Sequence, residues 1–310
     1  MRVAVTGTGG RLGRAVLSAL AAAPFTGMSG PLAWHRPDYD LDDPGAAARL
    51  IARDRPEVIV HAAAWTDVDG CARDPQTALR RNGEAVGHLA RAAAAAEIDL
   101  ILVSTNEVFD GARTDGRGYG PADPPNPINA YGASKLAGEV AAAQAYGWQA
   151  GTSPTTGPAL AIVRTAWLYG PPGNDFPEKI ARAAGRASAA GEPLKVVGDE
   201  TGSPTLTADL ADAIVGLVGE GVWFGGIHHI VNSAVATRAE WARAVLAGLG
   251  TAIPIEEIPA STWVRASIPP AWAVLEPTDN RTNGERLRTW QLALADYLPT
   301  LRRQLASTVR

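Results

Sequence analysis

The chain has 310 residues, enough for one large core or for a core with a small appended domain, and its net charge of −4 and scattered basic residues argue against nucleic acid or an anionic membrane as a partner. Its single cysteine, Cys71, excludes an intramolecular disulfide and fits a reducing compartment. Because the N-terminus runs straight into a Gly-rich turn rather than a signal peptide, and no apolar run reaches the ~20 residues that span a bilayer, we expect a cytoplasmic protein.

Short apolar runs alternate with helical patterns along the first half of the chain. The apolar runs predict buried strands at Val3–Val5, Leu32–Trp34, Val58–Val60, Leu100–Val103 and Leu160–Val163. The helical patterns lie near Leu12–Ala23, Ala46–Arg53, Thr77–Ala95 and Ala130–Tyr146. This alternation predicts an α/β fold, namely a doubly wound, mostly parallel sheet of the Rossmann type with helices on both faces.

The alternation loosens beyond Trp167, which indicates a smaller region over the carboxyl edge of the sheet. Two Gly-rich segments predict surface loops: Gln149–Pro158, and Arg113–Gly120, which is a solvated turn or a loop that closes over the substrate. A βα-like pair, Thr207–Val218 and Ile227–Val231, is expected to return to the main sheet. We expect a dinucleotide-binding domain at residues 1–165 plus about 205–232, and a discontinuous C-terminal substrate-binding region at about 166–204 and 233–310.

Glycines follow the first predicted strand and open the first predicted helix, which is the context of a dinucleotide-binding fingerprint. They permit a tight turn and a close backbone approach, and the helix N-terminus attracts a pyrophosphate. The alternative is a Gly-rich turn without a ligand. We expect cofactor contacts from Gly7, Gly10, Arg11, Leu12 and Gly13.

The end of the second predicted strand decides between the two nicotinamide cofactors. An acidic residue there binds the ribose 2′-hydroxyl of NAD, while an arginine accommodates the 2′-phosphate of NADP. Here the strand ends in Ala33-Trp34-His35-Arg36, and no acid precedes Asp38. Arg36, together with Arg11 inside the Gly-rich turn, therefore favours NADP(H), with NAD(H) as the alternative.

Tyr131 and Lys135 stand one helical turn apart and share a helix face. A nearby ammonium favours the phenolate, so we expect Lys135 to lower the pKa of Tyr131 and make it a general acid/base. The strand Leu100–Val103 delivers Ser104 and Thr105 to the carboxyl edge of the sheet, where a hydroxyl can bind a substrate carbonyl oxygen. The alternatives are a half-buried helix residue for Tyr131 and a turn cap for Thr105.

Further segments join these motifs across nearly the whole chain. They are Asp40-Leu-Asp42, His61-Ala-Ala-Ala-Trp-Thr-Asp-Val-Asp69, Asn82, Val108-Phe-Asp-Gly111, Asn126-Pro-x-Asn-x-Tyr131-Gly-x-Ser-Lys-Leu-x-Gly-Glu139, Arg164-Thr-x-Trp-x-Tyr-Gly170 and Gly202-Ser-Pro-Thr205. With them the chain resembles the extended short-chain dehydrogenase/reductases, and within these the dTDP-4-dehydrorhamnose reductase family.

The resemblance implies an NAD(P)-dependent oxidoreductase acting on CH–OH/C=O groups, with Thr105, Tyr131 and Lys135 as the catalytic set. The further cofactor contacts that it implies are Leu41, Asp42, Ala62, Ala63, Ala64, Ser104, Tyr131 and Lys135. It also implies that Thr66, Val68 and Trp167 contact a sugar. From the residues alone, Trp167 could equally fill the core, because the chain has nine tryptophans.

The segment after Thr105 departs from the family pattern. Asn106-Glu107 stands where these reductases read Asp-Tyr, while related sugar-nucleotide dehydratases read Asp-Glu, an acid and a base for eliminating water. Glu107 therefore favours a dehydratase, whereas Asn106 removes the acid. We expect Glu107 to contact the substrate in either case.

The nucleotide end of the substrate site departs as well. Glu200 replaces the first residue of the usual Gln-x-Gly-x-Pro-Thr, and Glu276-Pro-Thr-Asp-Asn280 stands where the family reads Arg-Pro-x-Asn-Ser. A carboxylate beside a substrate diphosphate would be repulsive. Either Arg281 or Arg265 supplies the missing charge, and we expect Arg281 to bind the substrate, or the substrate is not a sugar nucleotide.

The leading hypothesis is an NADPH-dependent ketoreductase with Tyr131 as general acid. Its substrate would be a 4-keto deoxy nucleotide sugar, as in dTDP-rhamnose biosynthesis, or another polyhydroxylated ketone. The alternatives are a sugar-nucleotide dehydratase or epimerase with tightly bound NAD, and a non-catalytic NADP-binding regulatory subunit like that of methionine adenosyltransferase. We expect no metal, because no carboxylate cluster has ligand spacing, and the resemblance allows a homodimer.

Overall fold

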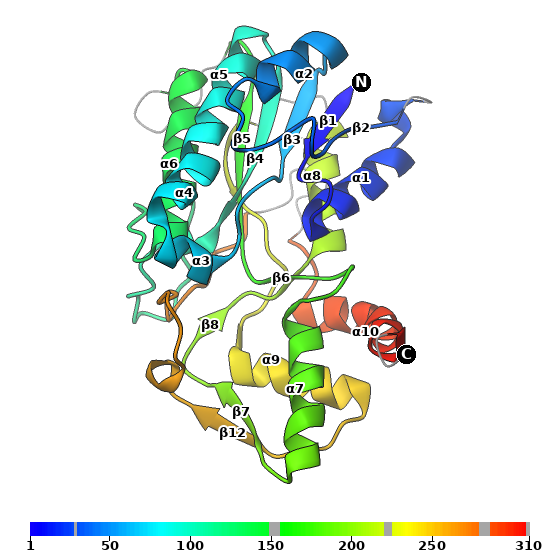
Figure 1. The fold of residues 1–310 in the computed structure, drawn as a ribbon, viewed down its shortest axis with the longest axis vertical. Helices are drawn as coiled ribbons and strands as arrows, with labels where there is room; N and C mark the ends of the chain where they lie inside the picture. Colours follow the sequence, from blue (N-terminus) through cyan, green and yellow to red (C-terminus); the bar gives the residue numbers. More distant parts are fainter. Residues whose placement is uncertain (28–29, 149–155, 220–224, 279–285, 308–310) are drawn as a thin grey trace.

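The computed structural model describes residues 1–27, 30–148, 156–219, 225–278 and 286–307, and it places a six-stranded parallel sheet in the larger of two lobes (Figure 1). The strand order is β10-β5-β4-β3-β1-β2. The bounds are β1 (Val3–Thr6), β2 (Leu32–Trp34), β3 (Val58–His61), β4 (Asp99–Thr105), β5 (Leu160–Thr165) and β10 (Gly226–His229). The predicted doubly wound α/β fold is confirmed.

Helices cover both faces of this sheet. On one face lie α1 (Arg11–Ala22) and α8 (Thr207–Gly219), and on the other α2 (Ala46–Asp54), α5 (Ala85–Ala95) and α6 (Ala130–Ala145) (Figure 1). Successive strand residues point to opposite faces, so Val5 packs under α1 and α8 while Ala4 packs under the other helices. Because both faces are buried, the strands are continuously apolar, which is why their positions were predictable.

The helix predicted at Thr77–Ala95 is interrupted. It consists of α4 (Pro75–Leu79), a π-helical turn η2 (Arg80–Glu84) and α5. The π turn carries Asn82, whose side chain accepts a hydrogen bond from the Trp65 backbone N–H at 2.8 Å and donates to the Trp65 carbonyl at 3.0 Å. The irregular turn therefore fixes the loop that follows β3.

The smaller lobe has a core of its own, centred on the buried ring of Trp241. Its helices are α7 (Phe176–Ala190), α9 (Arg238–Leu249) and α10 (Trp290–Ser307), and its strands are β6 (Leu168–Tyr169), β7 (Leu194–Val197), β8 (Thr201–Gly202), β9 (Thr205–Leu206), β11 (Ala236–Thr237) and β12 (Ile255–Ile258). Between the two parts of this lobe, α8 and β10 return the chain to the main sheet, with β10 beside β5. Among the described residues, no helix combines the length and apolar character needed to cross a bilayer.

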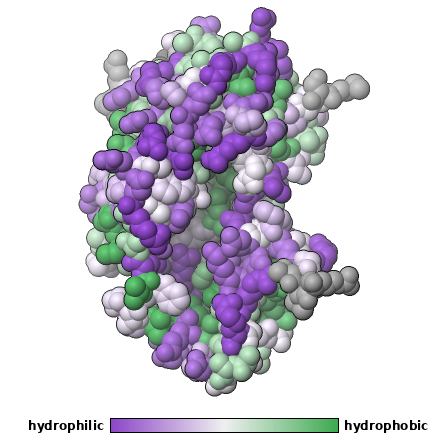
Figure 2. Space-filling view, in the orientation of Figure 1, coloured by the Kyte–Doolittle hydropathy of each residue, from purple (hydrophilic) through white to green (hydrophobic). Residues whose placement is uncertain are grey.

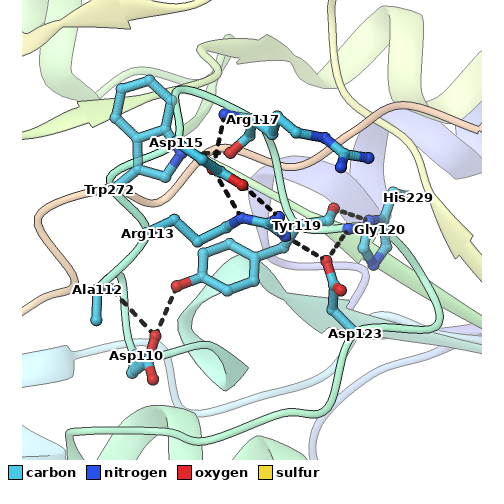
Figure 3. A network of polar contacts seen from close by, with 10 residues as sticks. All are labelled: Asp110, Ala112, Arg113, Asp115, Arg117, Tyr119, Gly120, Asp123, His229 and Trp272. Atoms are coloured by element: carbon cyan, nitrogen blue, oxygen red, sulfur yellow. Dashed lines mark hydrogen bonds and ion pairs between the residues drawn. The ribbon is translucent and has the colours of Figure 1, made fainter.

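Side-chain and backbone contacts hold the segment Arg113–Gly120 in place, so it is neither a free solvated turn nor an open flap (Figure 3). Arg113 forms ion pairs with Asp115 at 2.8 Å and with Asp123 at 2.7 Å. The ring of Tyr119 stacks on Phe109, with centroids 4.3 Å apart. Tyr119 forms backbone hydrogen bonds with Val274 and Glu276. Trp272 Nε1 donates a hydrogen bond to the Arg117 carbonyl at 2.8 Å. These bonds hold the loop against the C-terminal part of the chain.

Helix α6 begins against the turn η3 (Asn106–Val108), which follows β4. Asn129 caps the helix by accepting a hydrogen bond from the Gly132 N–H at 2.8 Å. A Cβ added to Gly132 would overlap the carbonyl oxygen of Glu107. Only a glycine permits this close approach.

Replacing Gly132 by alanine should therefore lower the free energy of unfolding by about 1–3 kcal/mol, because the helix must move away from the turn. Gly185→Ala in α7 is the matched control: nothing lies near the added methyl group. That variant should gain about 0.4–1 kcal/mol. Urea denaturation followed by circular dichroism measures the free energy of unfolding of both variants. Equal changes of the same sign in the two variants would contradict the close approach of α6 to the turn.

Candidate active site

A cleft of about 810 Å³ lies between the two lobes, at the carboxyl ends of the parallel strands. Figure 2 shows the molecule hollowed there. The predicted residues that line the cleft are Gly7, Gly10, Arg11, Leu12, Gly13, Arg36, Leu41, Ala62, Ala63, Ala64, Thr66, Val68, Ser104, Thr105, Glu107, Tyr131, Lys135 and Trp167. The chain reverses its strand order between β1 and β3, and ligands of doubly wound sheets bind at such a point.

The Gly-rich turn after β1 forms a cradle for an anion. Gly7 has a φ of +70°, and a Cβ there would lie 2.6 Å from the backbone nitrogen of Ala63. The loop bearing Ala63 is held by a bond from its N–H to Thr6 Oγ1 at 3.1 Å. Helix α1 begins after Gly10 with no side-chain cap and no acid in its first turn, so its N–H groups are free to meet a phosphate. These residues fit a dinucleotide.

Two predicted cofactor residues have other partners. Arg11 lines the cleft, but it donates from Nε to the Gly170 carbonyl at 3.0 Å and from Nη2 to the Gly173 carbonyl at 2.8 Å, and so links the two lobes. Asp42 does not line the cleft. The Asp42 carboxylate forms ion pairs with Arg81 and Arg80. Hydrogen bonds from these two arginines, above all from Arg81, lower the pKa of Asp42 to about 2.

Arg36 lies at the mouth of the cleft after β2, with 68% of its side chain exposed. Its guanidinium forms an ion pair with Asp40, four residues further along the chain, with Nε 3.6 Å from Oδ2. An exposed pair of this kind contributes little, so the guanidinium can turn to a ligand phosphate.

The three predicted catalytic residues meet in the cleft. Thr105 ends β4, and its hydroxyl donates to Asn106 Oδ1 at 3.3 Å. The Glu107 N–H also donates to Thr105 Oγ1, at 3.2 Å. One turn further along α6, Lys135 Nζ donates to the Val103 carbonyl at 2.8 Å.

The expected electrostatic effect of Lys135 on Tyr131 is wrong for this structure. Burial, followed by the nearby Glu107 carboxylate, raises the pKa of Tyr131, and the Thr105 side chain opposes that rise. Burial also lowers the pKa of Lys135 to about 8. Burial disfavours the charged form of each group. A phenol with a raised pKa is protonated at neutral pH and can donate a proton.

A buried ion pair stands behind the catalytic residues. Glu139 and Arg164 are 3% and 2% exposed, and Arg164 Nη2 lies 2.7 Å from Glu139 Oε2. Ser104 lines the cleft, yet its hydroxyl donates to Glu139. This hydroxyl therefore fixes the end of β4 rather than facing a ligand.

The far wall of the cleft would face a substrate. Glu107 accepts a bond from Asn129 Nδ2 at 2.7 Å, and burial raises the pKa of its carboxyl. Trp167 lines the cleft rather than filling the core only, and its φ of +44° is unusual for a bulky residue. Arg281 lies outside the described residues.

Arg238 is a cleft residue that sequence reasoning missed. Its guanidinium carbon lies 3.6 Å from the ring centroid of Trp167. It is the first residue of α9, which Thr237 and Glu240 cap reciprocally. The Thr-x-x-Glu spacing was a readable helix start that would have placed Arg238 at a helix N-terminus. The other missed residues include Trp34, Tyr39, Thr165 and Ala166.

A dinucleotide cradle that opens onto a threonine, a tyrosine and a lysine defines an NAD(P)-dependent oxidoreductase acting on CH–OH/C=O groups. A family model described as the RmlD substrate binding domain matches residues 1–303. The chain belongs to that family, which confirms the resemblance found in the sequence.

Named relatives are similar over nearly their full length. A dTDP-4-dehydrorhamnose reductase of Mycobacterium tuberculosis is 38% identical over 304 residues, which are 96% of this chain and 92% of the relative. A dTDP-4-keto-6-deoxy-D-glucose reductase of Streptomyces niveus is 35% identical, with 96% of each chain covered. The crystal structure of dTDP-4-dehydrorhamnose reductase from Bacillus anthracis in complex with NADP has a TM-score of 0.84 at 27% identity, covering 96% of this chain and 99% of that one.

Burial of Lys135 predicts a pH-dependent stability. Its folded pKa of about 8 lies below the ordinary 10.5, so the unfolded chain binds more protons between these values and stability rises with pH there. At about 1.4 kcal/mol per pKa unit, the charged lysine costs on the order of 3 kcal/mol at pH 7. The stability of Lys135→Met relative to the wild type should therefore fall between pH 8 and 9.5, as urea denaturation can measure. A constant difference would contradict the lowered pKa.

Proposed function

We propose that this protein reduces the 4-keto group of a dTDP-linked 6-deoxy sugar with NADPH, as a dTDP-4-dehydrorhamnose reductase does. The observation that carries the proposal is that Thr105, Tyr131 and Lys135 line the same cleft as the Gly-rich dinucleotide cradle. The names of the relatives from M. tuberculosis and S. niveus, both reductases of dTDP-linked keto sugars, support the substrate class.

NADPH, when bound, supplies a hydride to the carbonyl carbon. The Thr105 and Tyr131 hydroxyls then bind the carbonyl oxygen, and Tyr131 donates its proton as negative charge develops there. The raised pKa of Tyr131 keeps that proton in place until the oxygen becomes basic. Lys135, buried beside the Val103 carbonyl, is the candidate to hold the cofactor ribose.

The contacts of Asn106 argue against a sugar-nucleotide dehydratase. Asn106 Nδ2 donates to the Ala273 carbonyl at 3.1 Å, and its Oδ1 accepts from Thr105. An amide at this position has no proton to give to a departing hydroxyl group. Glu107 alone therefore does not make an elimination apparatus.

Replacing Tyr131 by phenylalanine should lower kcat for NADPH oxidation with dTDP-4-dehydrorhamnose by about 10²- to 10⁴-fold, because the proton donor is lost. The variant should still bind NADPH, as cofactor fluorescence would show. Undiminished turnover by the variant would remove Tyr131 from the mechanism. If the wild type binds NADPH but does not reduce this sugar, the substrate is wrong while the ketoreductase class stands.

The cofactor preference depends on Arg36. Arg36→Asp should raise the Michaelis constant for NADPH at least about tenfold more than that for NADH, since only NADPH carries the 2′-phosphate. Arg49→Asp, at an exposed arginine of α2 outside the cleft, is the control. An equal response of both cofactors to Arg36→Asp would show that this guanidinium does not read the phosphate.

A further inference from the structure

Glu200 and Glu276, two of the carboxylates that depart from the family's nucleotide-binding pattern, do not line the cleft, and the third, Asp279, lies outside the described residues. Glu276 is exposed, and its carboxylate lies toward Gly120, near Asp123. Glu200 is 3% exposed and forms ion pairs with two guanidinium groups, those of Arg238 (3.4 Å) and Arg265. Glu200 therefore holds arginines and does not face a ligand as a free charge.

The group that faces the cleft from this cluster is the guanidinium of Arg238, with 23% of its side chain exposed. Glu200 balances one of the two arginines, so the cluster of three carries a net positive charge. Glu107 also acts electrostatically on Arg238, but its hydrogen bond goes to Asn129. The cluster thus offers a cation to a ligand.

Two contacts fix the plane of this guanidinium. Arg238 lies flat enough over Trp167 for a 3.6 Å approach to the ring centroid, and its Nε is directed to Glu200. Its two terminal nitrogens form no hydrogen bond with the described residues. A stacked guanidinium held at Nε presents its outer N–H groups as a fork, which matches phosphate oxygens.

We propose that Arg238, positioned by Glu200 and Trp167, binds the diphosphate of the substrate. The proposal rests on the proposed function, whose substrate is a sugar nucleotide. The family's arginine is replaced by Glu276 in this chain, and Arg238 of α9 then supplies the positive charge instead. Glu200, the other departure from the family pattern, holds Arg238 in place. Arg238 contacts the ligand, and Glu200 is a positioning residue.

Calorimetric titration of the NADPH-loaded full-length protein with dTDP tests the proposal. Arg238→Gln should weaken dTDP binding by about 10- to 100-fold, the loss expected for one charge-assisted contact. The matched control is Arg243→Gln on the same helix, where the arginine pairs with Glu257 on the outer surface and half of its side chain is exposed. This control should bind dTDP like the wild type.

Equal affinities of the wild type and Arg238→Gln would overturn the proposal, and so would an equal loss in the control or a wild type that binds NADPH but not dTDP. Because dTDP carries no sugar, its binding does not depend on turnover. Arg238-dependent binding without reduction of the keto sugar would count against the proposed reaction only.

The role of Glu200 is tested by a double-mutant cycle. Glu200→Gln should weaken dTDP binding while Arg238 is present and have little further effect in the Arg238→Gln background. A merely structural role would give additive losses. Melting temperatures of the four proteins check that they fold.

Discussion

The close approach of helix α6 to the turn after β4 is the constraint on which the site depends. Gly132 lets the first turn of the helix meet the backbone of Glu107, and Asn129 caps the helix at that point. Tyr131, in that first turn, consequently lines the same cleft as Thr105 at the end of β4. In the reaction that we propose, the carbonyl oxygen of the substrate meets both hydroxyl groups. The sheet, with its Gly-rich turn two strands away, brings the cofactor to the same edge.

Burial then decides the charge states of these groups. It raises the pKa of Tyr131 and lowers that of Lys135, so each is held nearer to its neutral form than in water. This is the state expected of a proton donor that acts only when charge develops on a substrate. Behind the site, the buried side chains of Glu139 and Arg164 form an ion pair with each other.

The sheet, the Gly-rich turn and the meeting of Tyr131 and Lys135 in one cleft could be predicted, because each depends on a local pattern: buried apolar runs, a strand–turn–helix glycine motif and a one-turn helix spacing. The partners of Arg11 and Asp42 could not, since they are chosen by residues far away in the chain, Gly170 and Arg81 among them. The smaller lobe was predicted only as a region, because its strands have two to four residues each and its core joins residues far apart in the chain, such as Tyr169, Trp241 and Tyr297. Arg238 was missed because its place in the cleft is set by Glu200 and Trp167, which lie far away in the chain.

The most direct test of the account follows the hydride. The protein is incubated with a dTDP-4-keto-6-deoxy sugar and NADPH that carries deuterium at the transferred position of the nicotinamide, and the product is examined by mass spectrometry and NMR. The account predicts one deuterium per product molecule, on the carbon that bore the ketone, with one NADPH oxidised for each. Product formed without NADPH oxidation, or deuterium absent from that carbon, would contradict it.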